Sequence, residues 1–147
     1  MHSESLRRMA SPVRKGDEGM EQGKILNAHV QVRRMYNLLT EIQDLTTQIA
    51  HSLDRNDQVS TQMLIAMREE PLYKMAQARE IVIQQLESLS QEDSVRLRTI
   101  LNGGEAHTPE EKRLAEQVAM NGRLMQQVQM LDRQVNQKLT RDKSIYN

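Results

Sequence analysis

The sequence predicts an all-helical protein. Apolar residues recur at alternating spacings of three and four over long stretches, which is typical of helices that bury one face. Phe and Trp are absent and Tyr occurs three times, so a core must be built from aliphatic side chains and ten Met. We expect an elongated antiparallel helical hairpin or three-helix bundle with a long C-terminal amphipathic helix in residues 20–147. Residues 1–19, which contain Ser, Pro and Gly and show no apolar periodicity, are expected to form a disordered leader.

The first predicted helix covers about residues 22–54. Its apolar face follows a heptad-like repeat through four heptads, as in helices that pack along other helices. Thr46 is the one polar member of this face, and a polar elbow at 54–57 ends it. Asn56 or Asp57 can cap the helix that follows. The face consists of Ile25, Ala28, Val32, Met35, Leu39, Ile42, Thr46, Ile49 and Leu53.

The second predicted helix covers about residues 57–89 and contains Pro71. Proline removes one helical hydrogen bond and clashes with the preceding turn, so we expect a kink near this position. Because the apolar repeat resumes directly afterwards, one bent helix is favoured over two helices that meet at Pro71.

Two shorter signals predict the remaining helices. Ser90 and Asp93 form a variant capping box that opens a short helix at 91–101, and the glycines at 103–104 end it. Thr108 then begins the clearest helix start in the chain, with Pro109 in the first turn and Glu111 completing a capping box. This last helix is predicted for about 109–140, and the polar residues that follow are expected to fray.

Composition excludes several classes of function. Lys and Arg together number 20, and so do Asp and Glu, which argues against a nucleic-acid partner because such proteins carry a basic excess. No stretch is long and apolar enough to cross a membrane. Cys is absent, and the first residues lack the apolar segment of a secretory signal, so we expect a cytoplasmic protein.

No pattern in the chain predicts catalysis. None of the four His residues pairs with another ligand at helical spacing, so no metal site is expected. The chain has no nucleophile elbow, phosphate-binding loop or dinucleotide-binding turn. We therefore expect neither an enzyme nor a cofactor.

The apolar face of the last helix is the candidate binding surface. It can dock on a partner's helix, or it can be the third wall of a closed bundle, and the repeat favours neither. Asn121 within it is either a boundary residue bonded to its own backbone or water, or a buried residue that fixes register against another helix. Gly122 beside it lowers helix propensity. The face consists of Leu114, Val118, Asn121, Leu124, Met125, Val128, Leu131 and Val135.

Three stretches resemble the bacterial flagellar export chaperones of the FlgN/FliT type. These are the polar elbow at 52–57 with the returning segment 67–71, the run Asn121-Gly122-Arg123-Leu124-Met125, and the polar tail at 144–147. Met125 stands where the family's run has leucine. The resemblance implies a chaperone of type III secretion that acts in flagellum biogenesis. Its clients would be hook–filament junction proteins or the filament cap protein, delivered to the export apparatus.

The resemblance also implies that the apolar face of the last helix, from Leu114 to Val135, binds the client. Such a chaperone is expected to be a monomer or weak dimer. The competing hypothesis is a structural or adaptor coiled-coil protein that self-associates through its first helix. Self-association through that helix would survive loss of the last helix, whereas client binding would not.

Overall fold

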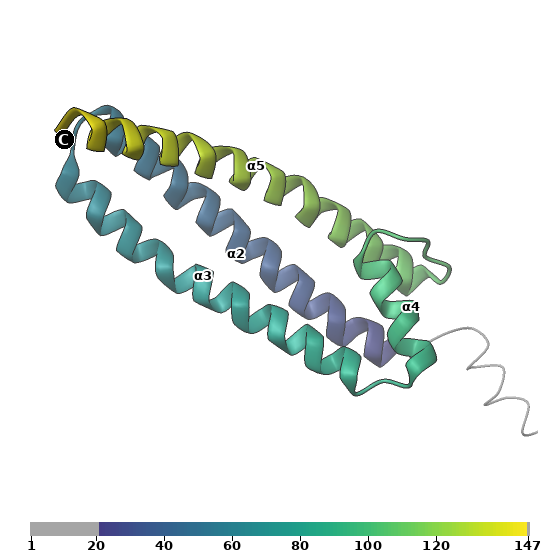
Figure 1. Cartoon of the computed structure of the whole chain (residues 1–147). Coiled ribbons are helices and arrows are strands. Elements are labelled where there is room, and N and C mark those ends of the chain that lie inside the picture. The colour runs from purple at the N-terminus through teal and green to yellow at the C-terminus, as the bar shows by residue number, and fades with distance from the viewer. Residues whose placement is uncertain (1–20, 147) are drawn as a thin grey trace, which may run out of the picture.

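The computed structural model describes residues 21–146, with side chains through Arg141, and this part of the chain is helical without any strand. The predicted all-helical class is confirmed. The leader expected in residues 1–19 lies outside the described residues. Four helices follow one another (Figure 1): α2 (Gln22–Asp54), α3 (Gln58–Glu87), α4 (Gln91–Leu101) and α5 (Pro109–Tyr146).

The elbow between α2 and α3 is a tight polar turn. Asn56 adopts a left-handed conformation with a φ of 57°, which Asn tolerates better than most residues. Of the two expected caps, Asp57 is the one used, because its carboxylate accepts from the Ser60 N–H at 3.0 Å. Buried Ser52 and Thr61 hydroxyls lie 2.5 Å apart across the turn. The turn therefore reverses the chain and lays α3 antiparallel to α2.

α3 passes through Pro71 as one continuous helix, so the alternative of two separate helices is wrong. The Pro71 ring is buried within the bundle. α5 also continues beyond the expected end near residue 140, to Tyr146.

α3 brings the chain back to the end of the bundle where α2 begins, α4 reverses direction there, and residues 102–108 connect it to the start of α5, which lies beside Gln22. Ser90 caps α4 by accepting from the Asp93 N–H at 3.2 Å, as its sequence predicts. Gly103 ends the helix with a φ of 87°, and a Cβ at Gly104 would lie 2.5 Å from the Thr99 side chain. This connection lets α5 run parallel to α2.

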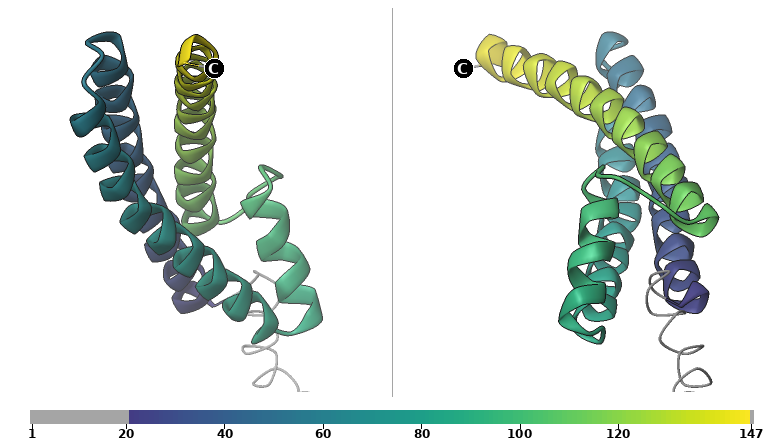
Figure 2. Two further views of the ribbon diagram at one scale, coloured as in Figure 1. Left: turned by 60° about the vertical axis from the view of Figure 1, so that its left-hand side comes forward. Right: turned by 90° about the vertical axis from the view of Figure 1, so that its right-hand side faces the viewer.

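α2 is the central helix, and α3 and α5 pack on it from two sides, making few direct contacts with each other. α5 crosses α2 at an inclination (Figure 2). Ties at both ends fix the parallel alignment of α2 and α5: Gln22 donates to Glu110 at 3.3 Å, and Lys138 donates to Asp54 at 2.6 Å. Three apolar clusters lie along α2, centred on Ala28, Leu39 and Ile49.

Candidate protein-binding groove

The predicted binding face of α5 is packed against α2. Four of its members are buried there, and the other four are half-buried. The face is therefore a wall of the bundle in this structure, although α3 and α5 do not close on each other. The buried members are Leu114, Leu124, Val128 and Val135, and the half-buried members are Val118, Asn121, Met125 and Leu131.

Of the two roles expected for Asn121, the structure shows a contact with a polar group on another helix. Its Nδ2 donates to the Val32 carbonyl on α2 at 2.8 Å, and its Oδ1 accepts from Gln117 Nε2 at 3.1 Å. A hydrogen bond at an otherwise apolar contact is satisfied at one alignment of the two helices. Asn121 thus fixes the register of α5 along α2.

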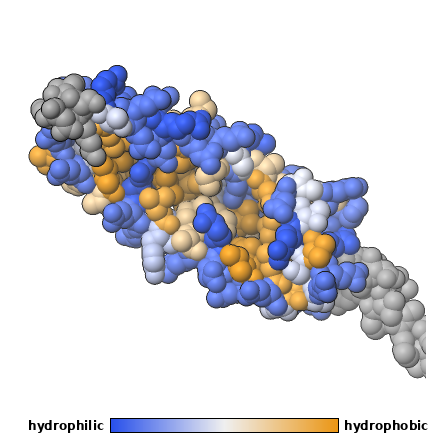
Figure 3. All heavy atoms as spheres, in the orientation of Figure 1, coloured by the Kyte–Doolittle hydropathy of each residue, from blue (hydrophilic) through white to orange (hydrophobic). Residues whose placement is uncertain are grey.

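An apolar groove lies between α3 and α5, over α2. Apolar residues gather in the band between these two helices (Figure 3). The groove encloses about 440 Å³. Its floor on α2 consists of Val32, Met35 and Leu39; its α3 wall of Met75, Arg79, Val82 and Ile83; its α5 wall of Val118, Asn121, Gly122 and Met125; and Leu101 and Asn102 stand at its α4 end.

Exposure at the groove is uneven. Ile83 on the α3 wall is 41% exposed, whereas Met75 deeper in the groove is buried. Three of the α5 residues expected to bind a client, Val118, Asn121 and Met125, line the groove. Part of the predicted face is therefore accessible without any movement of α5.

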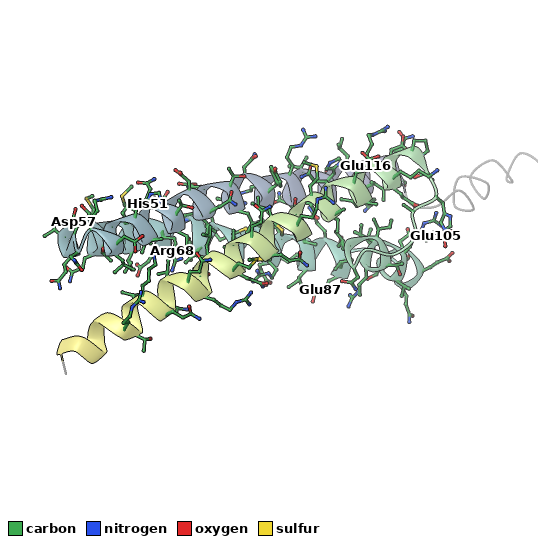
Figure 4. All side chains as sticks on the ribbon, turned by 90° about the horizontal axis from the view of Figure 1, so that it is seen from above. His51, Asp57, Arg68, Glu87, Glu105 and Glu116 are labelled. Atoms are coloured by element: carbon green, nitrogen blue, oxygen red, sulfur yellow. The ribbon has the colours of Figure 1, made fainter. Side chains whose placement is uncertain are left out.

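Beyond the floor of the groove, Arg68 bridges the two outer helices (Figure 4). Its Nη1 donates to Asp132 of α5 at 2.6 Å and to the Thr46 hydroxyl of α2 at 3.0 Å. Thr46 is fully buried and itself donates to the Ile42 carbonyl at 2.6 Å. This bridge was not expected from the sequence. The one feature that pointed to it is Thr46, the polar residue in the apolar face of α2.

A second ion pair holds α4 against α5 at the other end. Glu111 is 1% exposed, and it accepts from Arg96 Nε at 2.6 Å and Nη2 at 3.1 Å. It also accepts from the backbone N–H groups of His107 and Thr108, while the Thr108 hydroxyl accepts from the Glu111 N–H. The predicted capping box is therefore confirmed, and its Glu111 carboxylate is also a buried charge.

The charge on Glu111 is stabilised by these donors. Burial by itself raises the pKa of the carboxyl group, but hydrogen bonds from Arg96, His107 and Thr108 outweigh it and leave the pKa below its ordinary value. At His29, burial and the nearby charges of Arg33 and Arg113 lower the pKa. Both effects belong to the bundle's own packing, since neither residue lines the groove.

Within residues 21–141, whose side chains the structure describes, no group of three or more His, Cys, Asp or Glu side chains is placed to hold a metal ion. None of the four helices, as far as they are described, is both long and apolar enough to cross a membrane. No protein-family model, curated protein or solved structure matches the chain.

Proposed function

We propose that this chain is a non-catalytic binding protein whose groove takes an amphipathic helix of a partner protein. The observation that carries the proposal is the incomplete closure of the bundle. α3 and α5 both pack mainly on α2, and along the groove they leave a space between them that is lined mostly by aliphatic side chains and methionines. A fourth helix laid there would bury its apolar face on three helices at once, as in a four-helix bundle.

The lining suits a ligand of variable shape. Met35, Met75 and Met125 come from three different helices. Methionine is unbranched and polarizable, so such a surface can repack around different side chains. This property fits a protein that shields an aggregation-prone helix of its client, because a chaperone must accept apolar surface without a rigid complementary pocket.

Within this class, we propose a cytoplasmic export chaperone of the FlgN/FliT type. Support comes from the resemblance of the elbow, the run at 121–125 and the tail, and from the position of that run on the groove wall. Asn121, Gly122 and Met125 belong to both the resembling run and the groove. The proposed clients are hook–filament junction and cap proteins, contacted first through Val118, Asn121 and Met125.

Point substitutions on α3 test the groove better than truncation of α5, which would strip the buried face from α2. Ile83→Glu places a charge on the groove wall, and Met63→Glu places one outside the groove on the same helix, where Met63 is 56% exposed. Both variants should fold, because both side chains reach solvent. The assay is light scattering after size exclusion with the C-terminal helices of junction and cap proteins.

We expect a one-to-one complex with one of these helices that Met63→Glu preserves and Ile83→Glu abolishes. Equal binding by the two variants would refute the groove as the site. Failure to bind any of the client helices would refute the flagellar assignment.

Self-association is the alternative function, and one observation favours it. Val59, Met63 and Met67 form an exposed apolar strip at i, i+4 and i+8 on α3, outside the groove. Most of the apolar face of the first helix, through which the sequence predicts self-association, is covered by α3 and α5, and Met35 on it stays half-buried at the groove. A dimer of the chain alone that Met63→Glu dissociates would support this alternative.

A further inference from the structure

Gly122 is a costly residue that the fold itself does not require. It lies inside α5, where glycine destabilises a helix relative to alanine because it loses more backbone freedom. A Cβ added there would meet nothing within 4 Å, and its φ is not positive. Gly104 shows the contrast, because there the Thr99 side chain would block a Cβ.

Gly122 lines the groove, between Val118 and Met125 on the same wall. The missing side chain leaves bare helix backbone on this wall, with open space where a Cβ would stand, and we call this open space the notch. Glycine at a helix contact allows a second helix to approach the backbone closely and to form weak Cα–H···O contacts. Since nothing within the chain uses the notch, the notch suits a helix that enters from outside.

Arg79 supplies the charge preference of the groove. It is the one charged residue of the lining, and no hydrogen bond or ion pair joins its side chain to another residue in the described part of the chain. Guanidinium groups bind carboxylates through two parallel hydrogen bonds. A ligand helix with an acidic side chain at this position would complement an otherwise apolar surface.

Resting on the proposed function, we propose that the ligand is a partner helix that crosses α5 at Gly122 and sets an Asp or Glu against Arg79. Its apolar face covers the floor formed by Val32, Met35 and Leu39. Gly122 sets how closely the helix approaches, and Arg79 sets which charge the helix must carry.

The test uses a display library of amphipathic helical peptides of about 20 residues, roughly 30 Å long. All members share an apolar face, and the flanking positions vary among Glu, Gln and Lys. Selection on the intact chain should enrich Glu at one fixed position. Selection on Arg79→Glu should enrich Lys at that same position. The most enriched peptide then serves as a fluorescent probe of affinity.

Gly122→Ala provides the second arm. It should raise the urea midpoint of unfolding, because alanine is the better helix former, and still weaken the probe by about tenfold or more. Gly23→Ala is the control, since its Cβ also meets nothing but lies outside the groove, and it should leave probe affinity unchanged.

The outcomes separate the two proposals. If Arg79→Glu and Gly122→Ala leave binding of the selected peptides unchanged, while Ile83→Glu abolishes that binding, this inference is overturned. The groove then remains the binding site. A library that yields no binder sensitive to Ile83→Glu overturns the groove, and this inference with it.

Discussion

Replacing Glu111 with Gln tests whether a buried charge holds α4 to α5. The substitution keeps the size of the side chain and removes its charge. Glu111 accepts from Arg96 at 2.6 and 3.1 Å and from the backbone N–H of His107 at 2.9 Å. A Gln amide can keep one acceptor oxygen for these backbone donors, but its NH₂ group then faces the guanidinium of Arg96, and two donors cannot bond to each other.

The magnitude follows from burial. Hydrogen bonds to charged groups contribute about 1.5–3 kcal/mol each, and breaking a fully buried ion pair costs about 3–5 kcal/mol. Arg96 is 29% exposed, so water can solvate part of the abandoned guanidinium and reduce this penalty. We therefore expect Glu111→Gln to lower the free energy of unfolding by about 2–3 kcal/mol near neutral pH.

Urea unfolding followed by far-UV circular dichroism measures this loss. Glu110→Gln is the matched control, because the Glu110 carboxylate contacts Arg113 at 3.3 Å in a more exposed ion pair. We expect this variant to lose less than about 1 kcal/mol of the free energy of unfolding. The pKa of Glu111 is lowered in the folded state, so its contribution is present above about pH 4.5 and is lost as pH falls through the folded pKa. Equal losses for the two variants, or a Glu111→Gln protein with an unchanged acid transition, would refute the buried-charge argument.

Two further predictions concern the ties around α2. Arg68→Met should cost about 1–2 kcal/mol and speed amide hydrogen exchange in the C-terminal half of α5, because it removes the bridge to Asp132, whereas Lys74→Met in an exposed pair should do neither. If exchange in α5 is unchanged, Arg68 does not hold that helix. The lowered pKa of His29 means that the unfolded chain binds a proton more readily, so stability should decrease as pH falls below about 6.5, and His29→Gln should reduce that decrease in urea titrations; an identical pH profile in the variant would contradict this assignment.

The parts of the fold that follow from local physics could be predicted from sequence. The apolar repeat of α2 marks its buried face, and Thr108 with Glu111 marks the start of α5. Such signals act within one or two turns of chain, so a single sequence carries them. The role of Asn121 could be narrowed to two possibilities, and the Val32 carbonyl decides between them.

The groove could not be predicted, because it depends on how far apart two helices stand on a third. The repeat of α5 is the same whether the helix completes a closed bundle or leaves a gap beside it. Arg68 contacts Thr46 and Asp132 at separations of 22 and 64 residues, which no local pattern encodes. A polar Thr46 in the apolar face indicated a polar contact there, but the sequence did not indicate that Arg68 makes it.

The gap between α3 and α5 leaves part of the apolar surface of the groove open to solvent. The outer helices share two apolar clusters with α2, and Arg68 of α3 also reaches Asp132 of α5 and donates to the buried Thr46 hydroxyl. The chain has neither Phe nor Trp to fill this space, and on the groove wall Gly122 leaves open space where a side chain would stand. Groove residues such as Ile83 therefore keep part of their apolar surface in water, and the free energy that its burial would supply is not gained. The proposed partner helix would restore that burial, and this is the physical argument for a ligand at the groove.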